Sequence, residues 1–497
     1  MNAAISSTGS DRPTRARTTD SGRNRWLALV VLSLAQLMDI VDNTIMNIAL
    51  PSAQHDLGFS AGDRQWVVTG YALAFGSLLL LGGRLSDFFG RKRMFLIGVG
   101  GFAAASALGG AAGGLEMLLV ARIAQGVFGA LLAPAALSLL SVTFADNAEE
   151  RGRAFGIFGA ISGAGGALGL LLGGVLTQGL SWRWCLYVNI VIAAIAFAGA
   201  LVFLRDGDRP ARVRPDIAGT AAAVFGLVGI VYGLGNAESH GWNNPATLVP
   251  VSAGVLLVAA FVLIERRTQH PLLPLYVLLD RVRGSAYLTV AITGTGMFAI
   301  FLFLTYYLQN TLGFTPIQSG AAFLPMIAMV MVGAVFSGTA LMPHTGPRPL
   351  VPTGCLLAAI GMALLTGIGT DSGYATGVLP ALLVTGLGFG FIFGPIQNAA
   401  TSGVHAHDAG VASATVNTAQ QIGGSIGLAV FSSLTTTAID SYRTTPGTTL
   451  AQATIHAYHL VFWIAAAVFA GSAALGALLF RTGPLPVSAN DVTVEKH

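Results

Sequence analysis

Charged side chains are scarce in this sequence: Asp, Glu, Lys and Arg make up only 10% of its 497 residues. A soluble domain carries about 25% charged residues, so this scarcity excludes a typical soluble protein. Cysteine is rarer still, with Cys185 and Cys355 as the only two. They give neither a disulfide framework nor metal-ligand spacing. The sequence also lacks a nucleotide-binding P-loop, which argues against an ATP-hydrolysing protein.

What the sequence does contain is a series of apolar runs, each about 20 residues long, the length of a helix that crosses a bilayer. Membrane strands would need only about 9 to 11 residues of alternating polarity. We therefore predict an all-α membrane protein with fourteen transmembrane helices. The predicted spans are residues 26–50, 65–83, 94–113, 116–140, 153–178, 184–204, 217–236, 246–265, 286–308, 315–341, 349–369, 377–401, 409–434 and 457–480.

Arginine and lysine are distributed unevenly around these spans. With a cytoplasmic N-terminus, the inner segments hold 22 of the 26 basic residues, the outer loops hold 3, and Arg122 lies inside a span. Short cytoplasmic loops of membrane proteins are enriched in these residues. The pattern therefore predicts that both termini are cytoplasmic. It also makes the positive charge a topology signal, so we expect no nucleic-acid partner.

A loop pattern occurs twice, with an offset of 256 positions. The two copies are Gly82, Leu85, Gly90 and Lys92, and Gly338, Leu341, Gly346 and Arg348. Each copy follows the second span of a six-span block, which indicates a 6 + 2 + 6 plan. We predict a cytoplasmic N-terminal tail (1–25), an N-terminal six-helix bundle (26–204), two inserted helices with charged linkers (205–285), a C-terminal six-helix bundle (286–480) and a cytoplasmic C-terminal tail (481–497).

Three charges lie deep in the predicted spans: Asp39, Asp42 and Arg122. Counted from the outer ends of their helices at about 1.5 Å per residue, Asp42 and Arg122 lie at similar depths. An arginine inside a span needs a partner or a water-lined cavity, because its insertion costs about 2.5 to 3.5 kcal/mol. We therefore expect Arg122 to pair with Asp42.

Asp39 and Asp42 are three residues apart, so they share one side of a helix. Polar side chains extend this side outward, and we expect it to line a cavity. The candidate lining residues are Asn43, Met46, Asn47 and Gln125.

This charge cluster has a definite chemical use. Two acids close together cannot easily both be ionised, so the cluster can hold one exchangeable proton. If a substrate competes for the deprotonated carboxylate, an inward flow of protons can drive the substrate outward. Two carboxylates against one arginine also favour lipophilic cations.

Several segments resemble motifs of the major facilitator superfamily. They are GGRLSDFFGRKR (82–93), LLVARIAQGVFGALLAP (118–134) and GAISGAGGALGLLLGG (159–174). Together with MDIVDNTIMNIALP (38–51) and GVASATVNTAQQIGGSIGLAV (410–430), they resemble the fourteen-spanner drug:proton antiporters of that superfamily.

The resemblance implies roles for particular residues. It implies that Arg122 takes part in proton transfer. It implies a conformational latch formed by Gly83, Asp87, Gly90, Arg91 and Lys92. It further implies a helix-packing antiporter motif formed by Gly165, Gly169, Gly173 and Gly174.

The resulting hypothesis is a proton-coupled antiporter that exports lipophilic drugs or antibiotics across a bacterial inner membrane. We expect a monomer without enzymatic activity that uses the proton gradient and no cofactor. Its partners would be the lipid bilayer, protons and a small lipophilic molecule. That molecule would be either neutral or cationic. Two alternatives stay open: a proton-coupled transporter of a metabolite or siderophore on the same fold, and an intramembrane enzyme that uses Asp39 and Asp42 as an acid pair.

Overall fold

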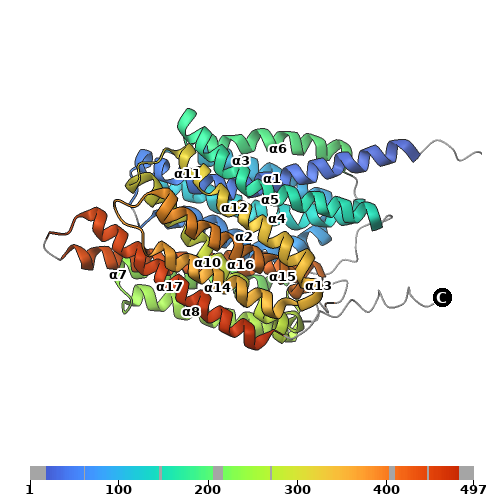
Figure 1. The fold of residues 1–497 in the computed structure, drawn as a ribbon. Helices are drawn as coiled ribbons and strands as arrows, with labels where there is room; N and C mark the ends of the chain where they lie inside the picture. Colours follow the sequence, from blue (N-terminus) through green and yellow to red (C-terminus); the bar gives the residue numbers. More distant parts are fainter. Residues whose placement is uncertain are drawn as a thin grey trace, which may run out of the picture.

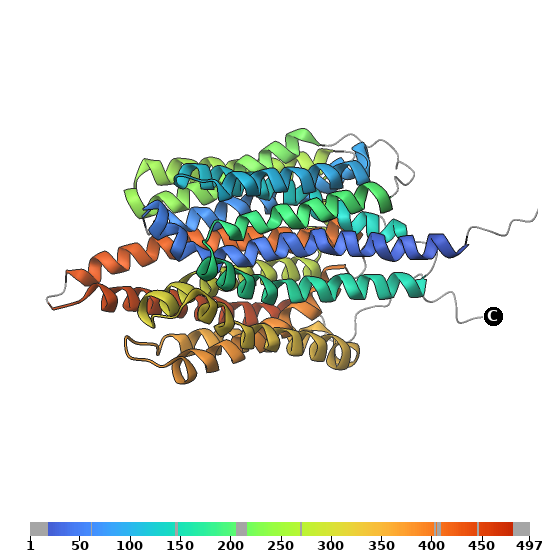
Figure 2. The same cartoon turned by 90° about the horizontal axis from the view of Figure 1, so that it is seen from above.

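The computed structural model describes residues 18–60, 62–144, 148–204, 216–268, 271–401, 404, 409–444 and 447–480. This part of the chain is helical almost throughout and contains no strand. Its long helices run side by side along one common direction (Figures 1 and 2). Fourteen of the helical stretches in the described part are long and apolar enough to cross a membrane, which confirms the predicted number.

The N-terminal bundle consists of the first six long helices. They are α1 (Thr18–Leu57), α2 (Arg64–Phe89), α3 (Arg91–Gly110), α4 (Leu115–Thr143), α5 (Ala148–Gly179) and α6 (Trp184–Phe203). The inserted pair, α7 (Ile217–His240) and α8 (Pro245–Arg267), follows, and a short helix, α9 (Leu275–Leu279), leads into the second bundle.

The C-terminal bundle supplies the other six spans, several of which contain π-helical turns (η). Its elements are α10 (Arg281–Ala299), η1 (Ile300–Leu304), η2 (Tyr307–Thr311), α11 (Pro316–Ala322), α12 (Leu324–Val335), η3 (Phe336–Leu341), α13 (Met342–Thr345), α14 (Pro347–Leu365), η4 (Tyr374–Val378), α15 (Leu379–Thr401), α16 (Ala409–Arg443) and α17 (Leu450–Leu479). These π-helical turns were not predicted. Helix α1 also begins at Thr18, inside the segment predicted as a tail.

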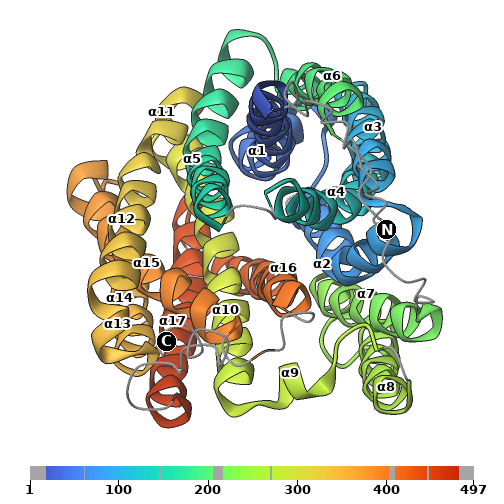
Figure 3. The same ribbon diagram turned by 90° about the vertical axis from the view of Figure 1, so that its right-hand side faces the viewer.

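Viewed along the helices, the two bundles lie next to each other, and α7 packs beside both α2 and α16 (Figure 3). Leu73 of α2, Val231 of α7 and Ala429 of α16 form a small buried cluster at this junction. Helix α8 packs mainly on α7. Only 11% of the most apolar stretch of α8 is buried inside the protein. Its exposed leucine and valine side chains therefore face lipid.

The beginning of α1 and the end of α17 lie at the same end of the molecule, which we call the terminal end (Figures 1 and 3). At the opposite, far end, side chains join the bundles. The Tyr306 hydroxyl donates to Gln54 Oε1 at 2.5 Å, and Gln309 Nε2 donates to the Ile48 carbonyl at 3.2 Å. The Arg64 guanidinium carbon lies 4.2 Å from the Tyr306 ring centroid. The far end is thus closed by polar and aromatic contacts.

The repeated loop has a glycine with a positive φ at the same place in both bundles. Gly90 and Gly346 have φ values of +101° and +70°, which favour glycine, and each precedes a helix. Lys92 Nζ donates to the Leu204 carbonyl at 2.7 Å, just after α6 ends. Arg348 Nε donates to the Ala477 carbonyl at 3.1 Å, near the end of α17. Each copy thus binds the carbonyl end of the last helix in its own bundle.

Candidate functional site

A cavity of about 620 Å³ lies between the two bundles. Helices α1, α2, α4 and α5 form one wall, and α10, η1, α12, α15 and α16 form the other. The lining extends toward the terminal end, where Leu137 of α4 and Gln397 of α15 are located. The contacts of Tyr306 and Gln309 lie beyond the cavity at the far end. In this conformation the cavity is therefore closed on the far side.

The described residues that line the cavity are mostly aromatic or amide-bearing. Six are phenylalanines: Phe75, Phe158, Phe298, Phe301, Phe389 and Phe393. Seven carry amides: Gln36, Asn43, Asn47, Gln397, Asn417, Gln420 and Gln421. Asp39 is the one charged side chain among the described lining residues. Such a lining suits an apolar, ring-containing molecule that carries a few polar groups.

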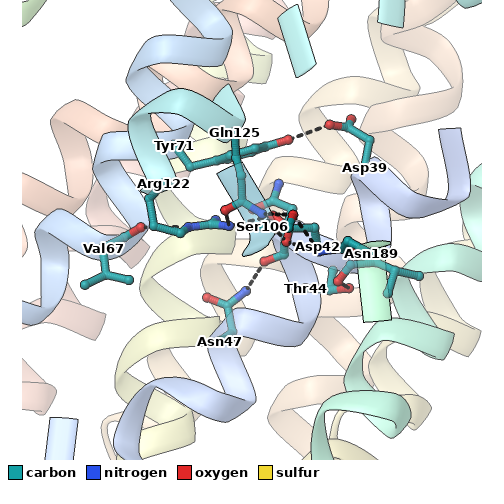
Figure 4. A network of polar contacts seen from close by, with 12 residues as sticks. Asp39, Asp42, Thr44, Asn47, Val67, Tyr71, Ser106, Arg122, Gln125 and Asn189 are labelled. Atoms are coloured by element: carbon teal, nitrogen blue, oxygen red, sulfur yellow. Dashed lines mark hydrogen bonds and ion pairs between the residues drawn. The ribbon is translucent and has the colours of Figure 1, made fainter. Parts of the chain in front are cut away.

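Asp39 borders this cavity from the middle of α1. The hydroxyl of Tyr71 donates to Asp39 Oδ1 at 2.7 Å (Figure 4). No lysine or arginine in the described part of the chain forms an ion pair with Asp39. The carboxyl group can therefore accept either a proton or a cationic group from the cavity.

Asp42 lies in the interior of the N-terminal bundle, where its side chain is 0% exposed and that of Arg122 is 1% exposed. Arg122 Nη1 lies 2.5 Å from Asp42 Oδ2. Asn189 Nδ2 and Gln125 Nε2 donate to Asp42 Oδ1 at 2.6 and 2.8 Å. The expected ion pair is present, and both oxygens of the acid are occupied. Removing one partner of a buried pair typically costs about 3 to 5 kcal/mol.

The guanidinium of Arg122 is held by further acceptors. Nε donates to the Val67 carbonyl at 3.2 Å, and Nη1 donates to Gln125 Oε1 at 2.8 Å. Gln125 in turn donates to Ser106 Oγ at 2.8 Å (Figure 4). A lysine ammonium could not reproduce this planar arrangement of donors.

Tyr71 connects the buried pair with the cavity. Its hydroxyl binds Asp39, and its ring centroid lies 4.6 Å from the Arg122 guanidinium carbon. The ring is also stacked on Phe75, with the centroids 5.8 Å apart. One side chain therefore contacts both the cavity carboxyl group and the buried cation.

The structure corrects the prediction that Asp39 and Asp42 face the same cavity. Three helical residues advance by about 300°, which leaves the two carboxylates about 60° apart around α1. Asp39, Asn43 and Asn47, at intervals of four, line the cavity. Asp42 and Met46, also four apart, point into the bundle and are buried.

Gln125 requires the same correction. It is fully buried on α4 beside Asp42 and does not belong to the cavity lining. Gln125 and Met46 were both predicted as lining residues. Their depth in the membrane suits the cavity, but their side chains point away from it around the helix axis.

Three residues of the network were missed by sequence reasoning: Tyr71, Ser106 and Asn189. Each is a polar residue inside an apolar span, which is the signal that could have revealed them. The prediction began from formal charges, and its uncharged polar candidates, Asn43, Asn47 and Gln125, lie on the same two helices as those charges. The network therefore contains more uncharged than charged side chains.

The glycines of α5 permit close contact with two neighbouring helices. A Cβ atom on Gly165 would lie 3.0 Å from Ile40 Cγ2, and one on Gly173 would lie 3.0 Å from the Ile45 carbonyl oxygen. Gly169 packs against α1 between them, and Gly174 packs against α11 of the other bundle. This helix thus joins α1 to the second bundle.

The predicted latch loop is described only in part, since the side chain of Asp87 lies outside the described residues. Gly83 packs loosely on α4, and Arg91 begins α3. Lys92 contacts its own bundle, whereas Arg84 Nη2 donates at 2.7 Å to the carbonyl of Pro271, ahead of α9. The described contacts of the loop thus reach α6 and the linker.

Residues 32–428 of the chain match the sequence model of the Major Facilitator Superfamily. The chain is 47% identical over 460 residues to the puromycin resistance protein pur8 of Streptomyces alboniger, covering 92% of this chain and 91% of that protein. It is 38% identical over 412 residues to the cephamycin export protein CmcT of Amycolatopsis lactamdurans, covering 82% and 84% of the two chains.

Among solved structures, the fold is similar to the POT family transporter PepTSo. The TM-score is 0.68 at 15% identity, and the match covers 91% of this chain and 99% of that one. A bacterial homologue of the lysosomal transporter Spinster gives a TM-score of 0.63, also at 15% identity, with 92% and 97% coverage. At this level of identity the similarity concerns the fold alone.

Proposed function

The chain belongs to the major facilitator superfamily, and we propose that it exports antibiotics or other lipophilic drugs in exchange for protons. It is a transporter and not an enzyme, and it is a multi-pass protein of the bacterial inner membrane. Relatives with 34 to 47% identity are named for resistance to, or export of, puromycin, cephamycin, tetracenomycin C and lincomycin, and one is named a probable actinorhodin transporter. These names support drug export as the direction and purpose of transport.

The observation that carries the proposal is the separation of two carboxylates with different surroundings. Asp39 borders the cavity and accepts one hydrogen bond from Tyr71. Asp42 is buried and paired with Arg122. A proton and a cationic substrate group can each neutralise Asp39, and binding of one therefore opposes binding of the other. This competition is the requirement for antiport.

The buried pair supports this exchange without contacting the cavity. The Arg122 cation lies against the face of the Tyr71 ring, and Tyr71 donates to Asp39. Neutralisation of Asp39 thus changes the electrostatic environment of Arg122 and Asp42. We propose that this coupling links occupancy of the cavity to the arrangement of α1, α2 and α4, which carry these residues.

The proposed transport cycle is alternating access. The basic residues at the terminal end support a cytoplasmic location for both termini. The far end would then face outward, and the structure would represent the state that loads substrate from the cytoplasm. Opening of the far end requires two hydrogen bonds to break, that of Tyr306 to Gln54 and that of Gln309 to the Ile48 carbonyl. The packing of Gly174 on Ile317 must separate as well.

An acid-pair enzyme is disfavoured by the same geometry. The side chain of Asp39 contacts Tyr71, whereas that of Asp42 contacts Arg122, Gln125 and Asn189. Two carboxylates that share a reacting atom must converge on it, and these diverge from one helix.

Export can be tested in proteoliposomes that contain the purified chain. Puromycin and lincomycin are suitable first substrates because relatives are named for them. An imposed proton gradient should drive accumulation of at least one drug, and collapse of the gradient by a protonophore should stop it. Accumulation that proceeds at the same rate without a gradient would contradict proton coupling, and no accumulation of any antibiotic in a broad panel would contradict drug export.

A further inference from the structure

Helix α16 presents an unusual polar surface to the cavity. Asn417, Gln420 and Gln421 all line it, and their spacing of three and four residues places them on one side of the helix. They belong to the stretch GVASATVNTAQQIGGSIGLAV, for which the proton site on α1 gives no explanation. We call these three residues the amide face.

Close packing fixes the amide face in its position. Gly294 of α10 approaches the Gln420 backbone so closely that a Cβ atom would collide with its carbonyl group. On the other side, a Cβ atom on Gly76 of α2 would lie 3.0 Å from Gln421 Cβ. Glycines on both flanking helices thus bring α16 to the cavity. Its amides therefore project from a rigid helix and not from a loop.

The hydrogen-bonding capacity of the amide face is largely unused. Gln420 Nε2 has the Met297 sulfur at 3.6 Å, a weak acceptor. Within the described part of the chain, Asn417 and Gln421 have no side-chain hydrogen-bond partner. Gln397, by contrast, also lines the cavity but donates to Ser413 Oγ at 2.8 Å. Each unused amide offers both a donor and an acceptor to a bound molecule.

We propose that the amide face is a second substrate subsite, which binds neutral hydrogen-bonding groups such as carbonyl, hydroxyl or amide groups. This proposal rests on the proposed export function and specifies its substrate class. Asp39, on the opposite bundle, takes the cationic group, and phenylalanines of the lining such as Phe393 contact the apolar part between them. The favoured substrate is an amphipathic monocation whose other end carries uncharged polar groups.

The amide face acts mainly as a selectivity device. A cation without hydrogen-bonding groups would cover these amides and leave them unpaired, which disfavours its binding. A substrate with a carbonyl or hydroxyl group restores the bonds that the amides make to water. The cavity should therefore prefer polar drugs over simple hydrocarbon cations of the same charge.

The test compares two cationic probes on the purified full chain. Daunorubicin carries an amine with carbonyl and hydroxyl groups, whereas tetraphenylphosphonium has no hydrogen-bonding group. Binding of both is measured by titration for the parent and for the near-isosteric variants Asn417→Leu and Gln421→Met. Each variant should weaken daunorubicin binding by roughly three- to tenfold, the effect of one neutral hydrogen bond. Binding of tetraphenylphosphonium should be unchanged or tighter.

Asn398→Leu is the matched control, because Asn398 is an exposed amide on α15 that does not line the cavity. It should leave both affinities unchanged. The amide-face proposal would be wrong if the variants lost the same affinity for both probes, or if folded variants bound daunorubicin as the parent does. Neither result would contradict the proposed export function. If the parent bound and transported neither probe nor any antibiotic, the proposed function would fail first and the amide face would fail with it.

Discussion

Tyr71 donates a hydrogen bond of 2.7 Å to Asp39 across the interface of α2 and α1. This bond is the direct link between the cavity and the buried polar network, because the Tyr71 ring also faces Arg122. A tyrosine in this position can transmit a change in charge without itself becoming charged. Its hydroxyl and its ring can be tested separately.

Tyr71→Phe should weaken export of cationic substrates more than export of neutral ones. The substitution keeps the ring beside Arg122 but removes the donor that orients Asp39, at a cost of about 0.5 to 1.5 kcal/mol. Transport of a matched cationic and neutral pair measures the effect. Tyr232→Phe, at a half-exposed tyrosine on α7, is the control. If Tyr71 had a purely structural role, export of both substrates would fall equally.

Asp39→Asn should abolish proton-driven export of cations while sparing binding of neutral compounds. The amide keeps the shape of the side chain but can neither release a proton nor attract a cation. Loss of a charge-assisted hydrogen bond should weaken cation binding by about 1.5 to 3 kcal/mol. Titration of the purified variant with a matched cationic and neutral probe measures binding, and dose-response curves of an efflux-deficient strain measure export. Equal weakening of neutral-probe binding would contradict the assignment of Asp39 as the site of the cationic group.

Asp42→Asn and Arg122→Gln should each destabilise the purified protein, because each leaves an unpaired buried charge or donor. The expected cost is about 3 to 5 kcal/mol for each single substitution. The double variant should recover part of this stability without recovering transport, since the interaction between the two sites is lost only once. Thermal unfolding in detergent and transport assays of all four proteins complete the cycle. Additive destabilisation would show that the two side chains do not act as a pair.

Gly174→Leu should favour opening of the far end. A Cβ atom there would lie 2.5 Å from the Ile317 backbone, so a leucine pushes α5 away from α11. A cysteine introduced at Asn47 reports the change through its labelling by a membrane-impermeant maleimide added outside the cell. We expect labelling several-fold faster than in the parent.

Gly179→Leu is the control for this experiment, because a Cβ atom at Gly179, on the same helix, meets no described atom within 4 Å. It should label like the parent. Unchanged labelling of a well-expressed Gly174→Leu protein would exclude this contact as part of the outer closure.

The sequence predicted those features that depend on depth in the membrane. Long apolar runs gave fourteen helices because an uncovered charge or backbone group is costly in lipid. The pairing of Asp42 with Arg122 was predictable because the two residues lie at matching depths and an unpaired charge is costly in lipid. The repeat at Gly90 and Gly346 was visible because a positive φ favours glycine in both copies.

Features that depend on rotation around a helix axis were not predictable in this way. Met46 and Gln125 were expected to line the cavity but are buried within the bundle. Rotation is set by packing of neighbouring helices, here by the contact of Gly173 with Ile45, and a single apolar span carries little information about it. Tyr71 and Asn189 were missed because they lie on α2 and α6, which carry none of the three deep charges from which the prediction began.

The two stripes of α1 restrict how this helix can move. Asp39, Asn43 and Asn47 must stay in the cavity, and Asp42 must stay beside Arg122, although the stripes are only about 60° apart. Turning α1 about its own axis would expose the buried ion pair or bury the cavity amides. We therefore expect α1 to move by tilting together with the helices that hold it, α4, α5 and α6. A one-residue deletion before Asp39 would shift the register by about 100° and should be far more harmful than a deletion in the loop after α1.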